Sequence, residues 1–334
     1  EETFDDREYD EELLADERKT PTQFIADASR SIIAENNSPD VGFRWSINAY
    51  RGCEHGCAYC YARPTHEAFG WSAGLDFETR ILVKHDATAL LRRELARPSW
   101  SGDVIAISGV TDCYQPAERR FRLTRGILEV MNEANQPAGL ITKNALVRRD
   151  LDLLAPMAAR GLIHVFFSIT TLDAELARTM EPRTSPPAMK LAAIKALSDA
   201  GVPVGVMVAP VVPGLTDHET PAILEAAHHA GARSAGYVLL RLPLTVVPVF
   251  QAWLAENYPD KRDRVESLIR STRGGALYQT GWGVRQRGVG QYAERISQNF
   301  KVFARKFGLD GRLPELDSSQ FRPPRSATGQ MSLF

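Results

Sequence analysis

Six short apolar segments, separated by amphipathic stretches, recur along the chain and constrain its fold. The strand candidates are Trp45–Ala49, Val104–Ser108, Gly139–Lys143, Ile163–Ile169, Val204–Val208 and Ala235–Leu240. Helix candidates lie between them near 86–96, 119–134, 150–160, 186–200 and 217–230. This alternation predicts βα repeats around a parallel sheet. A full eight-stranded barrel would need two further strand signals, which we do not find.

The regions that flank these repeats differ from them in composition. Residues 1–22 carry ten acidic and three basic side chains, which predicts a disordered acidic tail. We expect residues 23–44 to form a docking segment and residues 45–245 to contain the βα repeats. Residues 246–313 predict a basic helical extension, with helices at 247–257, 260–271 and 290–306. Residues 314–334 are rich in Pro and Ser and predict a flexible tail.

Cys53, Cys57 and Cys60 lie in one loop directly after the first predicted strand, spaced C-x3-C-x2-C. Ligands of parallel α/β sheets bind beyond the carboxyl ends of the strands. A cubane iron–sulfur cluster needs one external ligand for each of its four irons, so three thiolates leave one iron open. The alternative is zinc, with His55 or His66 as fourth ligand, although a second cysteine pair is missing.

This loop, with Tyr59 just before the last cysteine, resembles the signature of the radical S-adenosylmethionine (SAM) enzymes. The resemblance implies one [4Fe–4S] cluster on the three cysteines and SAM chelated to the open iron. It implies reductive cleavage of SAM to a 5′-deoxyadenosyl radical. The implied fold is a partial (β/α)6 TIM-like barrel of the radical SAM type, here with a helical C-terminal extension.

The same resemblance implies SAM contacts at the ends of the later strands. Family members hold the amino group, ribose, carboxylate and adenine of SAM with loops at these positions. The matching residues here, with Tyr59 of the cysteine loop, are Ser108, Gly109, Thr111, Asp112, Lys143, Asn144, Ser168, Thr170, Val208 and Pro210.

Four segments resemble an uncharacterised bacterial subfamily of radical SAM proteins related to spore photoproduct lyase, a DNA repair enzyme. They are residues 52–66, 74–78, 111–116 and 203–210. The relation implies a lyase-type repair reaction on DNA, with electrons from a donor such as flavodoxin or ferredoxin. Modification of RNA or of a protein side chain is an alternative, as is a non-catalytic iron–sulfur or zinc protein that binds nucleic acid.

Cys113 is a candidate hydrogen-atom donor to a substrate radical, with Tyr114 as a relay beside it. The lyase's cysteine would align near Gly109 or Val110, so the match is displaced by a few residues. A buried structural thiol, the usual role of a lone cysteine, has equal standing.

The C-terminal third suggests two partners. From Arg241 onward there are fifteen Lys and Arg against eight Asp and Glu, which suits a nucleic acid as well as a solvated surface. The basic candidates are Arg262, Arg264, Arg270, Arg273, Arg285 and Arg287, with Tyr278 and Trp282 available to stack on bases. The terminal residues Gln330, Met331, Leu333 and Phe334 resemble the peptide by which bacterial repair proteins bind the sliding clamp. Such an apolar terminus could also dock onto its own domain.

Two features bear on location. The sequence has neither an apolar run long enough to span a bilayer nor a signal-peptide pattern. Sparse cysteines and an oxidisable cluster predict a reducing cytoplasm.

Overall fold

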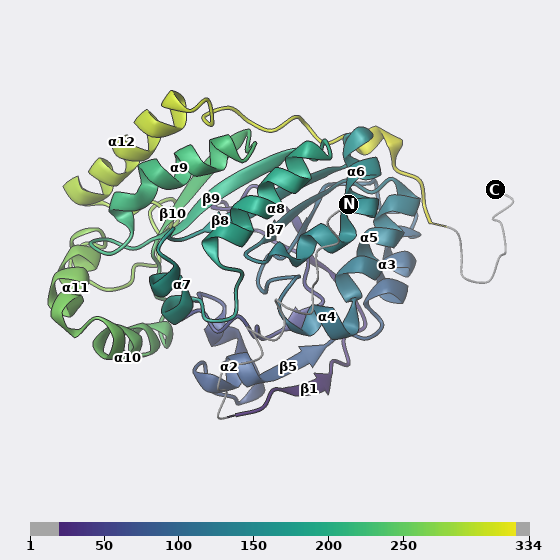
Figure 1. Ribbon diagram of the computed structural model, residues 1–334. Coiled ribbons are helices and arrows are strands. Elements are labelled where there is room, and N and C mark those ends of the chain that lie inside the picture. Colours follow the sequence, from purple (N-terminus) through teal and green to yellow (C-terminus); the bar gives the residue numbers. More distant parts are fainter. Residues whose placement is uncertain (1–19, 325–334) are drawn as a thin grey trace, which may run out of the picture.

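Six parallel strands, adjacent in the order of the sequence, form the central sheet of the computed structural model, which describes residues 20–324 (Figure 1). They are β3 (Trp45–Ile47), β6 (Ile105–Ile107), β7 (Ala138–Thr142), β8 (Ile163–Ile169), β9 (Val204–Val211) and β10 (Ser234–Leu239). A seventh strand, β2 (Ile33–Glu35), pairs antiparallel with β3 at the edge. The six predicted strands are confirmed, because buried strands show as local runs of apolar residues.

A second, smaller sheet lies below the central one in Figure 1. Its strands are β1 (Gln23–Ala26), β5 (Arg80–Val83) and β4 (Tyr50–Arg51), in the order β1-β5-β4. The helix α2 (Leu75–Thr79) immediately precedes β5. The sequence pattern does not predict this sheet, and residues 23–44 contribute a strand to each of the two sheets.

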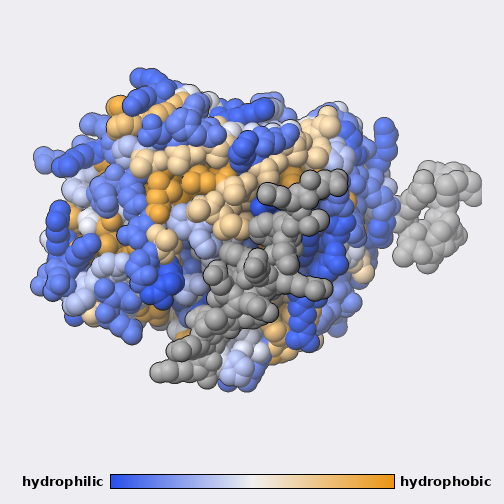
Figure 2. All heavy atoms as spheres, in the orientation of Figure 1, coloured by the Kyte–Doolittle hydropathy of each residue, from blue (hydrophilic) through white to orange (hydrophobic). Residues whose placement is uncertain are grey.

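Helices follow the strands, as the alternation predicts; most of those before residue 230 and the last one pack against the central sheet, whereas the two within residues 246–271 pack in a separate apolar cluster. They are α3 (Ala87–Leu95), α4 (Ala117–Phe121), α5 (Leu123–Ala134), α6 (Leu151–Ala159), α7 (Ala174–Met180), α8 (Pro187–Asp199), α9 (Thr220–His229), α10 (Val246–Asn257), α11 (Arg262–Ser271) and α12 (Gly290–Lys306). Short 3-10 helices cover Arg63–Phe69 (η1), Ala145–Asp150 (η2), Asp217–Glu219 (η3), Pro259–Lys261 (η4) and Ser318–Gln320 (η5). Hydrophilic residues cover most of the surface in Figure 2, around a band of apolar ones.

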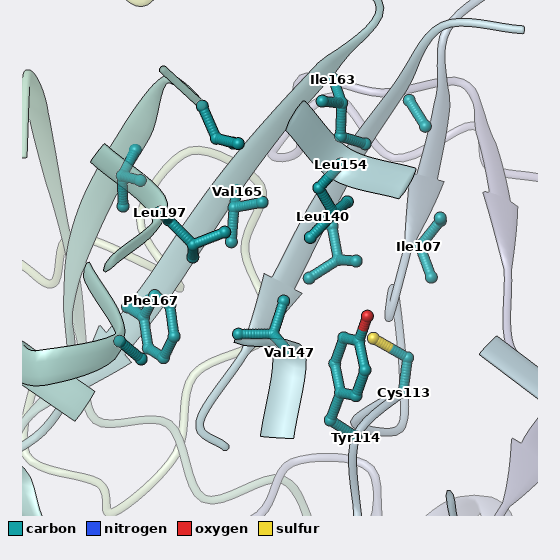
Figure 3. Close-up of a cluster of buried hydrophobic side chains, with 14 of the residues drawn as sticks. Ile107, Cys113, Tyr114, Leu140, Val147, Leu154, Ile163, Val165, Phe167 and Leu197 are labelled. Atoms are coloured by element: carbon teal, nitrogen blue, oxygen red, sulfur yellow. The ribbon is translucent and has the colours of Figure 1, made fainter. Parts of the chain in front are cut away.

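The two faces of the central sheet differ in burial. Ile107, Leu140 and Val165 are fully buried on one face, where Leu154 of α6 and Leu197 of α8 pack against them (Figure 3). On the other face, Ile141, Phe166 and Met207 are only half-buried. Because successive side chains of a strand point to opposite faces, neighbouring residues lie alternately on the helix-covered face and on the open face. The open face is the inner face of a partial barrel.

Two predicted segments lie largely or wholly outside the described residues: the acidic tail, up to residue 19, and the terminal peptide Gln330–Phe334. Within residues 20–324 no helix is both long and apolar enough to cross a membrane.

Candidate active site

The three cysteines of the loop lie between β4 and η1, next to the small sheet. Cys53 and Cys57 are buried, Cys60 is partly exposed, and all three are free thiols. The backbone N–H of Cys53 donates to the carbonyl of Phe77, at 2.9 Å, which ties the loop to α2. The small sheet and α2 therefore position the first cysteine.

The electrostatics of the loop suit a group that carries positive charge. Burial raises the pKa of all three thiols, that of Cys57 to about 12, and the neighbouring cysteines raise that of Cys53 further. Three thiolates so close together would be unstable unless cations compensated them. Iron ions compensate thiolate charge in this way, so the donor set fits an iron–sulfur cluster.

The histidines proposed for a zinc site have other contacts. The Nε2–H of His66 donates to the carbonyl of Arg80, at 2.8 Å, and the ring packs edge-on against Phe77. The Nε2 of His55 lies 3.3 Å from the side-chain amide of Asn144. In the described part of the chain, no three His, Cys, Asp or Glu side chains converge on a position for one metal ion. Zinc needs its ligands about 2.0–2.3 Å from one ion, whereas a cubane spreads its thiolates over separate irons.

Two buried arginines hold the backbone of the cysteine loop. Arg63 donates to the carbonyls of Cys57 and Gly56, both at 3.0 Å, and to Glu78, at 3.2 Å. Arg183 donates to the carbonyl of Glu54 and to the other oxygen of Glu78. Gly56 has a φ of 66°, and a Cβ at this position would collide with Arg183. The loop thus depends on a glycine and on two guanidinium groups that share one carboxylate.

A buried polar network centred on Glu181 lies beside the loop. Glu181 accepts hydrogen bonds from Lys143 and Lys190, both at 2.9 Å, from Thr170, at 2.6 Å, and from the hydroxyl of Tyr59. Burial alone would raise the pKa of Glu181, but the two lysines and the hydrogen bonds hold it well below its ordinary value. Glu181 is therefore an anion at neutral pH. Glu181 and Lys190 are not among the predicted site residues, since nothing in the local sequence distinguishes them from surface charges.

Several of the predicted SAM contacts come together at this network. The Nζ of Lys143 lies 3.2 Å from the Oγ1 of Thr170 and 5.5 Å from the ring centroid of Tyr59. Ser168 lies opposite Met207, on the open face of the sheet. The structure thus brings Tyr59, Lys143 and Thr170 together at the carboxyl edge of the barrel, and Ser168 lies near the same end of β8.

Other predicted contacts have partners within the protein. Asp112 accepts hydrogen bonds from the hydroxyl of Thr142 and the backbone N–H of Lys143, both at 2.7 Å. Asn144 caps η2 through the N–H of Leu146. The remaining members do the following: Ser108 accepts from the N–H of Cys113, Thr111 donates to the carbonyl of Tyr50, the Gly109 carbonyl accepts from Tyr61, and Val208 and Pro210 are buried. Their contacts with SAM stay predictions.

Cys113 and Tyr114 lie on the helix-covered side of the central sheet. Figure 3 shows them among Leu140, Val147 and Leu154, within the apolar core. Burial raises the pKa of the Cys113 thiol well above its ordinary value. The hydroxyl of Tyr114 donates to buried Asp150, at 2.9 Å. This placement favours the buried structural thiol over the hydrogen donor, which stays a prediction.

Some of the basic residues predicted to contact phosphate have internal roles. Arg273 is buried and donates to four backbone carbonyls, those of Leu239, Leu240, Val284 and Arg285. It braces the end of β10, so the prediction of a phosphate contact is wrong for this residue. The guanidinium of Arg285 pairs with Asp40 and stacks on Trp282, 4.0 Å from the ring centroid. These two arginines differ from the exposed ones in their burial, which cannot be read from the sequence.

Comparisons with known proteins agree with this architecture. Residues 47–227, just over half of the chain, match the family model of the Radical SAM superfamily. An uncharacterized protein of Mycobacterium tuberculosis is 40% identical over 236 residues, covering 70% of this chain and 69% of that protein. One of Methanocaldococcus jannaschii is 27% identical over 226 residues, covering 68% and 81%.

Among solved structures, spore photoproduct lyase complexed with dinucleoside spore photoproduct has a similar fold, with a TM-score of 0.61. The match covers 85% of this chain and 79% of the lyase, at 17% identity. A mutant of that lyase with bound AdoMet and dinucleoside spore photoproduct has a TM-score of 0.62, at 17% identity, and the match covers 85% of this chain and 78% of the mutant. The fold, the cysteine loop and the family match together lead to one conclusion: the chain belongs to the radical SAM superfamily.

Proposed function

We propose that this chain binds one [4Fe–4S] cluster through Cys53, Cys57 and Cys60 and cleaves SAM reductively. When bound, the cluster and SAM supply the electron and the 5′-deoxyadenosyl radical that abstracts a hydrogen atom from the substrate. The observation that carries the proposal is the loop itself. It places three free thiols, braced by Arg63 and Arg183, at the carboxyl edge of a parallel barrel.

The residues around the loop would position the cofactors and keep water out. The two arginines fix the backbone that carries the cysteines, because their rigid forks reach several carbonyls at once. Lys143 offers a cationic group at the edge of the open face, next to the Tyr59 ring. Glu181 and Lys190 hold Lys143 and Tyr59 in place. Such a preorganised polar shell is what radical chemistry requires of the protein.

For the substrate we propose DNA, in a repair-type reaction like that of a photoproduct lyase. Two observations support this choice: the fold likeness to spore photoproduct lyase and the excess of basic residues in the C-terminal third. An RNA or a protein side chain is the alternative substrate. The electron donor would be a small redox protein of the flavodoxin or ferredoxin kind.

The first experiment tests the cofactors. The wild-type chain is reconstituted anaerobically with iron and sulfide, and 5′-deoxyadenosine is measured by chromatography after reduction with dithionite in the presence of SAM. We expect about four irons per chain and 5′-deoxyadenosine from the wild type. Cys57→Ala should lose both, whereas Cys113→Ala, a matched change outside the loop, should keep its iron. A chain that binds zinc and takes up no iron would refute the proposal.

The second experiment tests the substrate class. Fluorescence anisotropy compares the binding of ultraviolet-irradiated DNA, untreated DNA and RNA of the same sequence at several salt concentrations. DNA as substrate predicts tighter binding of DNA than of RNA, and an affinity that falls steeply with salt. Preference for RNA would favour the alternative substrate. Weak binding of both nucleic acids by an active enzyme would favour a protein side chain.

A further inference from the structure

A cavity of about 350 Å³ lies between the loop after β9 and the helices α11 and α12. Gly214 and Leu215 line it together with the side chains of Asp217, His218, Lys261, Arg264, Tyr292 and Arg295. Its volume lies at the lower end of the range typical of ligand pockets, about 300–1,000 Å³. Most such pockets are lined mainly by apolar side chains, whereas three of the side chains here are basic.

The cavity has an excess of positive charge. Lys261, Arg264 and Arg295 are exposed, and none of them forms an ion pair with another residue in the range 20–324. Asp217 is the acidic residue in the lining. Its carboxylate already accepts from the hydroxyl of Tyr292, at 2.5 Å, and from the backbone N–H of Gly214, at 2.8 Å. Three cations and one carboxylate therefore line the cavity, and the hydrogen bonds of that carboxylate are made within the protein.

This arrangement suits a phosphate group that belongs to a long chain. Arginine presents donors in a planar fork that matches phosphate, and lysine adds a point charge. A small-molecule site buries most of its ligand, whereas the three cationic side chains here are exposed to solvent. When a phosphate of a nucleic acid binds at such an open site, the rest of the backbone can extend along the protein surface on both sides.

The cavity and the candidate active site border the same apolar cluster of the core. Leu215, in its wall, belongs to the same packed apolar cluster as Cys57 and Tyr59 of the cysteine loop. The loop that carries Leu215 and Asp217 follows β9, at the carboxyl end where the cofactors are expected. A substrate that reaches the cysteine loop could therefore rest on this cavity.

We propose that the cavity formed by Lys261, Arg264 and Arg295 binds a backbone phosphate of the nucleic acid substrate and positions it beside the active site. This inference rests on the proposed function, because it takes DNA as the substrate. It adds a specific site, distinct from Arg273 and Arg285, which the structure uses internally.

The test compares two double variants of the full-length protein that each remove two positive charges. Arg264→Gln with Arg295→Gln changes the cavity, and Lys301→Gln with Arg305→Gln changes exposed residues of α12 that do not line it. Anisotropy with a labelled DNA duplex is measured between 50 and 200 mM salt, and pyrophosphate is titrated separately by calorimetry. These binding assays need no SAM cleavage, so they are independent of whether the cluster proposal holds.

We expect the cavity variant to bind DNA at least about tenfold more weakly than the control variant, since each charged hydrogen bond contributes about a factor of ten. The slope of log affinity against log salt should become shallower by about 0.9 for each phosphate that the variant no longer neutralises. Equally weakened binding in both variants would overturn the cavity site and leave DNA as substrate. Cavity-dependent binding of pyrophosphate without binding of DNA would overturn the nucleic acid as its ligand.

Discussion

The bracing of the cysteine loop by Arg63 leads to a quantitative prediction. All five N–H groups of its guanidinium donate hydrogen bonds of 2.8–3.2 Å, to the carbonyls of Cys57, Gly56, Ala73 and Gly74 and to Glu78. The side chain is almost completely buried, at 1% relative exposure. Arg63→Lys keeps the charge but replaces the planar fork by a compact ammonium group.

The magnitude follows from the bonds that lysine cannot make. An ammonium at this depth can reach about two of the five acceptors, so about three hydrogen bonds disappear, each contributing about 1 kcal/mol. Arg63→Lys should therefore lower the free energy of unfolding by about 3 kcal/mol. That is a large fraction of the roughly 5–15 kcal/mol typical of a folded protein.

The assay is urea unfolding of the metal-free protein followed by far-ultraviolet circular dichroism, together with the iron content after reconstitution. Arg178→Lys is the matched control, because Arg178 forms an exposed pair with Glu175 in α7. Such pairs contribute about 0–1 kcal/mol, so the control should stay close to the wild type. We expect Arg63→Lys to lose both stability and iron. If it unfolds within about 0.5 kcal/mol of the wild type and holds the same iron, the bracing argument is wrong.

Three further predictions concern other parts of the chain. Cys113→Ala should lower the free energy of unfolding by about 1 kcal/mol, measured in urea, because it leaves a small gap in the core; a changed reaction product would instead support the hydrogen donor. Burial lowers the pKa of His164, so its contribution to stability is present above its ordinary pKa of about 6.5 and is lost as the pH falls below it. Unfolding measured between pH 5 and 7.5 should show a weaker pH dependence for His164→Gln, and equal slopes would contradict this. A labelled peptide of the last ten residues should bind a bacterial sliding clamp in the micromolar range and lose binding on Leu333→Ala with Phe334→Ala; no saturable binding below about 100 µM would remove the idea.

The strands of the central sheet could be predicted because their signal is local. β8 and β9 are buried runs of apolar residues, and each lies within a range predicted from the sequence or extends it by a few residues. The small sheet could not be predicted in this way. Gln23 of β1 pairs with Arg80 of β5, and β4 has only two residues. Strands this short are stable only through partners far away in the sequence.

The residues of the candidate site also differ in whether their signal is local in the sequence. Cys53, Cys57 and Cys60 could be found because a cluster loop places its ligands at short, regular spacing. Glu181 and Lys190 could not, since charged residues are normally found at the surface and their burial as a pair depends on neighbours from several elements. Arg273 was wrongly predicted to contact phosphate. It lies in a basic segment, but its buried guanidinium donates to backbone carbonyls of the protein itself.

The sequence by itself determined the family, the cysteine loop and the order of the parallel strands, because spacing and periodicity are properties of neighbouring residues. Only the tertiary structure decided which side of the sheet receives Cys113 and Tyr114. It also decided which cations are buried around the cysteine loop and which face the cavity of α11 and α12. Burial and charge pairing arise when distant segments pack together, and no local pattern records them.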